Sequence, residues 1–110
     1  MFKKGDVVTY IGETNGAYEK GKNYEIVGYD KELNLYGVMS DLEEAYCVAE
    51  EFLKKSDAKI YKTLNDLAKD YPEKSAREAQ LKKMSNAQIN VLIDSMHNTQ
   101  GKIYLESFKA

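Results

Sequence analysis

The apolar residues of this 110-residue chain change their spacing once, near residues 54–59. Before this point they lie in short runs rich in β-branched and aromatic side chains, separated by segments with glycine and asparagine. After it they recur at intervals of three and four residues, which is the spacing of one face of a helix. A single change of this kind favours an α+β fold, with strands first and helices second. We therefore expect a β domain over residues 1–54 and a helical region over residues 55–110.

The first half predicts four short strands, over residues 6–11, 23–29, 35–40 and 45–49. Residues 13–22 contain Asn15, Gly16 and Gly21, so we expect a long surface loop there. Gly28 and Gly37 fall inside expected strands, where a glycine permits a bulge or a sharp bend. The expected architecture is a small bent antiparallel sheet or a barrel. The pattern by itself leaves a plain four-stranded meander open.

Several segments of this half resemble the strands of SH3-like barrels. The residues concerned are Phe2 to Tyr10, with a Gly-Asp-x-Val opening, Gly21 to Ile26, and Tyr46 to Leu53 as a closing strand and short last turn. The layout is similar to small proteins encoded by phages and prophages of Gram-positive bacteria, and the resemblance covers about residues 2–54. It implies a scaffold used for recognition more than for catalysis, and it assigns no functional residue.

The second half predicts about three helices. The first covers residues 60–71 and ends at Pro72, because proline disfavours helical geometry at the residue before it. The second covers residues 73–84 and has only a thin apolar stripe. Ser85 and Gln88 form a capping box at the start of a third helix. Gly101 is a candidate cap for the end of that helix, and residues 102–108 favour a short helix only slightly over a strand.

Composition and cysteine use limit the class of protein. The chain is 43% hydrophobic and 31% charged, which is a composition that folds. No run approaches the roughly 18 apolar residues of a membrane helix, and we expect no membrane partner. The start of the sequence lacks the apolar core of a signal peptide. Cys47 is the single cysteine and cannot form an intramolecular disulfide, so we expect a reducing cytoplasm.

The sequence assembles no catalytic set. His97 is the only histidine and falls at an expected helix end, where we expect an exposed side chain. Cys47 lies in an expected strand, where we expect a buried structural thiol. One histidine and one cysteine cannot build a zinc site of nitrogen and sulfur ligands, and the glycines do not spell a phosphate-binding loop. We therefore expect a protein that is not an enzyme and that uses no metal or cofactor.

The charges are distributed unevenly between the two halves. Residues 1–54 hold six lysines and eleven acids, a net of −5, and residues 55–110 hold ten basic residues and seven acids, a net of +3. The two halves could attract each other within one fold, or one of them could meet a partner. The densest acidic group consists of Asp41, Glu43, Glu44, Glu50 and Glu51.

Nine tyrosines make aromatic contacts with a partner a reasonable expectation, since tyrosine is enriched at interfaces. Tyr36 and Tyr46 border the acidic group, and Tyr18 lies in the expected loop as the best candidate for an exposed contact. We expect these three tyrosines and the five acids to bind a partner protein. The resemblance makes a phage-type inhibitor possible, one that docks on a host defence or nucleic-acid-processing protein.

Two other functions stay open. The first is nucleic-acid binding by the basic helices, and its candidate residues are Lys74, Arg77, Lys82 and Lys83. The second is self-association through the apolar stripe of the third expected helix, formed by Ile89, Leu92, Ile93 and Met96. The oligomeric state does not follow from the sequence.

Overall fold

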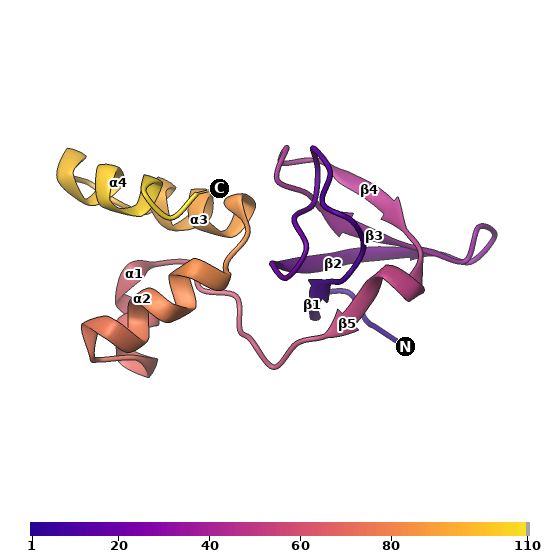
Figure 1. Cartoon of the computed structure of the whole chain (residues 1–110), viewed down its shortest axis with the longest axis horizontal. Helices are drawn as coiled ribbons and strands as arrows, with labels where there is room; N and C mark the ends of the chain where they lie inside the picture. The colour runs from indigo at the N-terminus through magenta and orange to yellow at the C-terminus, as the bar shows by residue number, and fades with distance from the viewer. Residues whose placement is uncertain (110) are drawn as a thin grey trace.

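The computed structural model describes residues 1–109 and confirms the α+β class. An antiparallel sheet occupies one end of the molecule and four helices occupy the other, as Figure 1 shows. The molecule is elongated, with extents of 45 × 24 × 22 Å. Within residues 1–109, no helix is both long enough and apolar enough to cross a membrane.

The sheet has five strands, one more than the strand pattern predicts. They are β1 (Val7–Tyr10), β2 (Asn23–Asp30), β3 (Leu35–Met39), β4 (Ala45–Val48) and β5 (Leu53–Lys55), in the spatial order β4-β3-β2-β1-β5. The sheet is open, with β4 and β5 at its edges. The unpredicted β5 is only three residues long and follows the 3-10 turn η1 (Glu50–Phe52), so its short run carried no alternation of its own.

A bulge bends the sheet where the mid-strand glycine predicted one. The pairing of β2 with β3 shifts register between Ile26 and Gly28, and Gly28 then pairs with Gly37. The bend lets both halves of the sheet wrap one apolar cluster. The buried members of that cluster are Val8, Tyr10, Tyr18, Tyr24, Ile26, Tyr36, Val38, Val48 and Leu53.

The second half contains four helices where about three were predicted. They are α1 (Leu64–Asp70), α2 (Lys74–Lys83), α3 (Asn86–Asp94) and α4 (Thr99–Glu106). The Ser85 cap is confirmed, since its side chain accepts the Gln88 N–H. The first helix begins at Leu64, not at residue 60, because Thr63 caps it by accepting the Asp66 N–H.

The sequence suggested that Gly101 caps the end of a helix, and this expectation was wrong. Gly101 lies in the first turn of α4, and its N–H donates to the Asn98 side chain, which caps that helix at its start. The ambiguous segment 102–108 is largely helical, since α4 runs to Glu106.

The helices bury a second apolar cluster of their own. Its fully buried members include Leu67, Leu81, Ile89, Leu92 and Leu105. Ile93 and Met96 pack against it, so the stripe predicted for self-association is used within the chain. The two halves of the molecule therefore have separate cores.

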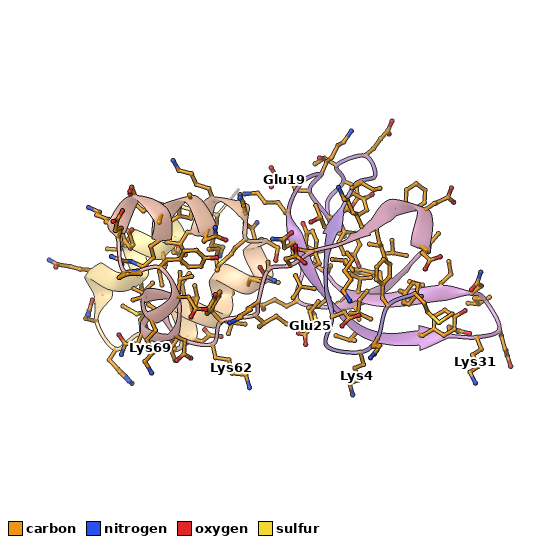
Figure 2. All side chains as sticks on the ribbon, turned by 90° about the horizontal axis from the view of Figure 1, so that it is seen from below. Lys4, Glu19, Glu25, Lys31, Lys62 and Lys69 are labelled. Atoms are coloured by element: carbon orange, nitrogen blue, oxygen red, sulfur yellow. The ribbon has the colours of Figure 1, made fainter. Side chains whose placement is uncertain are left out.

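A small polar junction joins the two halves. Asn23 at the start of β2 forms an isolated parallel bridge with Met84, and the Lys22 ammonium donates to the Lys82 carbonyl. The linker over residues 56–63 runs along one side of this junction (Figure 1). Figure 2 places Glu25 near the junction and Lys31 at the far tip of the β2–β3 hairpin.

Candidate functional site

The edge strand β4 and the residues at its two ends form the most exposed part of the sheet. Ala45, Tyr46 and Cys47 are all exposed, and only Val48 is buried. β4 pairs with β3 alone, in the register Tyr36 with Val48 and Val38 with Tyr46. We refer to β4, the preceding turn 40–44 and η1 together as the β4 face.

The five acids predicted to bind a partner divide into two groups. Glu44, Glu50 and Glu51 remain exposed on the β4 face. The N-terminal amine lies 3.7 Å from Glu50. Among the described residues, no lysine or arginine forms an ion pair with any of these three carboxylates. Within residues 1–109, Glu44 and Glu51 therefore have no cationic partner, and Glu50 has only the N-terminal amine.

Asp41 and Glu43 are directed to the helices instead. The Asp41 carboxylate accepts the Asn86 N–H at 2.8 Å and the Tyr24 hydroxyl at 2.9 Å, so it ties the first turn of α3 to the core of the sheet. Glu43 accepts a hydrogen bond from the Asn90 side chain at 3.1 Å. These two acids hold the junction together, which the sequence did not indicate.

Tyr46 is the one predicted tyrosine that the structure leaves exposed. Its side chain is 40% exposed, and its hydroxyl donates to Glu44 Oε2 at 2.9 Å. The hydrogen bond to this carboxylate raises the pKa of the Tyr46 phenol, because ionisation would place two negative charges side by side. Tyr46 therefore presents a neutral aromatic ring beside an acid.

Tyr18 is not an exposed contact, contrary to the expectation from its loop position. It is 4% exposed, and its hydroxyl donates to the Val38 carbonyl at 2.6 Å. Tyr36 is likewise buried, at 3% exposed, and its hydroxyl accepts the Phe2 N–H and donates to Glu50 Oε1 at 3.4 Å. Tyr36 can thus orient Glu50, but neither ring can meet a partner directly.

Two exposed apolar residues of the β4 face were missed by the sequence reasoning. Leu42 is 57% exposed in the turn before β4, and Phe52 is 43% exposed in η1 after it. Leu42 lies between Asp41 and Glu43, and Phe52 directly follows Glu50 and Glu51, so an apolar residue next to acids was the signal available. Together with Tyr46 they supply apolar contact area among the carboxylates.

The basic residues proposed for nucleic acid are only partly available. Lys74, Lys82 and Lys83 are exposed on α2. The Arg77 guanidinium is occupied, since it donates to the carbonyls of Tyr71 at 3.0 Å and Pro72 at 2.9 Å. The residue type best suited to bidentate phosphate contacts therefore closes the end of α1 instead.

The two residues considered for catalysis lie apart, on different halves of the molecule. His97 is exposed between α3 and α4, as expected. Cys47 is exposed on β4, so the expectation of a buried thiol was wrong. Alternation along a strand could not reveal this, because β4 is an edge whose outer face no element covers. Over residues 1–109, no group of three or more His, Cys, Asp or Glu side chains could hold a metal ion.

Comparison with protein-family models, with curated proteins and with solved structures finds no match for this chain.

Proposed function

We propose that this protein is a non-catalytic binding module that holds a basic region of a partner protein against the β4 face. The observation that carries the proposal is the combination of an exposed edge strand with three carboxylates that no lysine or arginine among residues 1–109 neutralises. Opposite charge on a partner would steer its approach and select it over neutral surfaces. Tyr46, Leu42 and Phe52 supply the apolar area that charge alone lacks.

The uneven charge of the two halves supports the same proposal. The ion pairs of the structure are Met1 with Glu50 and Lys59 with Asp70, and each lies within one half. Among the residues that the structure describes, no ion pair crosses the junction. The acidic side is therefore left for a partner and is not consumed by the basic helices.

The resemblance to phage and prophage proteins directs the first search to bacterial host proteins. A protein whose basic groove ordinarily holds nucleic acid is the partner that the acids would fit best, since carboxylates would replace phosphates in that groove. The proposed setting is the cytoplasm, where an exposed lone thiol stays reduced.

The test is affinity capture with matched charge-reversal variants. The immobilised protein is incubated with nuclease-treated lysate of a Gram-positive host, and the captured proteins are quantified by mass spectrometry. The pair Glu44→Lys and Glu51→Lys should lower capture of a stoichiometric partner by about tenfold or more. The control pair is Asp94→Lys and Glu106→Lys, which makes the same change of charge on exposed positions of α3 and α4.

Equal capture by both pairs and the wild-type protein would contradict the proposal. Capture that disappears with nuclease and with Lys82→Glu and Lys83→Glu would move the function to the basic helix α2.

A further inference from the structure

The backbone of β4 presents unpaired hydrogen-bonding groups on its free side. In an antiparallel ladder, residue pairs that exchange hydrogen bonds alternate with pairs that do not. The Ser40 N–H donates to the Glu44 carbonyl at 2.9 Å, which identifies Ser40 with Glu44 as a bonded pair. By alternation in the observed register, Val38 with Tyr46 is bonded too. Ala45 and Cys47 therefore point their N–H and C=O groups away from β3.

Both ends of this free edge are closed. The residue before Glu44, Glu43, has a positive φ of 62° and turns the chain away. The Ala49 carbonyl accepts the Phe52 N–H at 3.1 Å, which starts η1. Within the described residues, no further hydrogen bond outside the ladder uses the backbone of Ala45 or Cys47. The edge can thus pair with only a short strand, through the outward-facing backbone groups of two residues.

The other edge strand is protected and β4 is not. β5 is three residues long and carries the exposed lysines Lys54 and Lys55, which is a common protection of a sheet edge. β4 contains no lysine and no proline. An edge left open in this way is available for pairing with an added strand.

We propose that β4 receives an extended basic segment of the partner protein as a sixth strand of the sheet. This rests on the proposed function and names how the partner is held. The basic character follows from charge: Glu43 and Glu44 precede the edge, and Glu50 and Glu51 follow it. A second copy of this chain does not fit, because two β4 edges would bring these acids against each other.

The two faces of β4 specify which side chains the added strand carries. On the outer face, Cys47 pairs with Gly37 and Gly37 with Gly28, so a shallow hollow of about 480 Å³ crosses three strands. Asp30 and Glu32 line it together with Lys31. A long arginine opposite Cys47 can lie over Cys47 and Gly37, on the side of the sheet that carries these carboxylates.

The inner face of β4 favours a different type of residue in the added strand. Tyr46 lies on that face beside Glu44, so its ring offers an apolar surface to the residue opposite it. The favoured segment therefore alternates arginine or lysine with β-branched residues, because successive side chains of a strand point to opposite faces.

The probe is a blocked heptapeptide of alternating arginine and valine, titrated by calorimetry and by NMR. We expect binding with increased protection of the Ala45 and Cys47 amide protons against exchange. Two further forms of the peptide are N-methylated at its odd or at its even residues, and both keep the charge of the parent peptide. Only one of the two sets directs its N–H groups to β4. N-methylation of that set should weaken binding about tenfold or more, and N-methylation of the other set should not. A peptide with glutamate in place of arginine should not bind.

A pair of variants tests the same point from the protein side. Cys47→Pro removes an outward N–H and no ladder bond, and edge strands tolerate proline at such positions. It should weaken the peptide about tenfold, whereas Cys47→Ala should not change its affinity. If Cys47→Pro does not fold, the N-methylated peptides still decide the question.

The outcomes separate the mode of binding from the proposed function. The two N-methylated forms and the parent peptide could bind equally well, with binding lost in the Glu44→Lys and Glu51→Lys variant. This result would overturn the added strand and keep the acidic docking face. Failure of the arginine peptide to bind at all would overturn the added strand. The proposed function would then be tested by the lysate capture alone. A mass that rises with protein concentration and falls in Cys47→Pro would assign the edge to a second copy.

Discussion

Buried tyrosine rings with bonded hydroxyl groups form the centre of the sheet. The rings of Tyr10 and Tyr18 stack at 5.3 Å, and Tyr18 meets the edge of Tyr24 at 5.0 Å. Each hydroxyl finds a partner, since Tyr10 donates to the Glu13 carbonyl and Tyr24 to Asp41. A tyrosine can occupy a core only when its hydroxyl is satisfied in this way. Residue type alone therefore could not separate core tyrosines from exposed ones.

The buried phenol of Tyr18 predicts a loss of stability in alkali. Burial raises its pKa from 10.0 to about 12. As the pH rises, the unfolded chain loses this proton before the folded protein does. The contribution of the protonated phenol to the free energy of unfolding is therefore complete below pH 10 and disappears as the pH rises to about 12. Urea unfolding at several pH values between 9 and 12 should show Tyr18→Phe losing less stability with pH than the wild-type protein. Parallel pH dependences of the two proteins would contradict this.

At the scale of elements, three side-chain caps set where helices begin. Ser85, Thr63 and Asn98 each accept an N–H from three residues ahead. The Ser85 cap could be predicted because a glutamine and an apolar stripe follow it. The Asn98 cap could not, because asparagine and glycine serve at the end of one helix as readily as at the start of another.

Loss of the Ser85 cap should destabilise the helical half. Ser85 is 1% exposed and accepts the Gln88 N–H at 3.3 Å, so Ser85→Ala leaves a helix N–H without its partner. We expect a cost of about 1 kcal/mol in the free energy of unfolding. The control is Ser75→Ala on the exposed side of α2, which should be neutral within about 0.5 kcal/mol. Denaturant titration of both variants measures the difference; equal costs would show that the cap is not the cause.

At the scale of the whole molecule, few contacts couple two separate cores. The sheet and the helices each bury their own cluster, and hydrogen bonds of Asp41, Glu43 and Lys22 connect them. The coupling therefore depends strongly on individual polar groups, beside an apolar crevice that Met39 of β3 shares with Ala87 and Val91 of α3. Of the β4 face, only the turn 40–44 contacts the helices in these hydrogen bonds, through Asp41 and Glu43.

Asp41→Ala should uncouple the halves. The variant removes the acceptor of the Asn86 N–H and of the Tyr24 hydroxyl, and bonds to a charged group contribute about 1.5–3 kcal/mol. Hydrogen exchange should show α3 amides losing protection while β3 amides keep most of theirs. Glu51→Ala is the control, since it removes one exposed charge and no contact across the junction. A fall of equal size in both halves, or none in α3, would contradict the role of Asp41.

Local sequence patterns predicted the class of fold, the order of strands before helices and the capping of α3. Alternation and helical spacing are short-range properties, and most of the strand and helix positions follow from them. Charge counting also located the acidic run, because composition does not depend on the fold. The short strand β5 was missed because it lacks a pattern of its own, and the start of α1 shifted from residue 60 to Leu64.

Tertiary structure alone decided which of these residues face solvent. Tyr18 reaches Val38, and Asp41 reaches Asn86 across 45 positions of sequence. Such contacts depend on which strand lies next to which, and no local period reports that. Cys47 is exposed because it lies on the outer face of the sheet beside Gly37, whereas Tyr36 is buried because it lies on the opposite face beside Val48, in the apolar cluster. Sequence therefore determined the elements and their charge, and strand order determined the surface that a partner can reach.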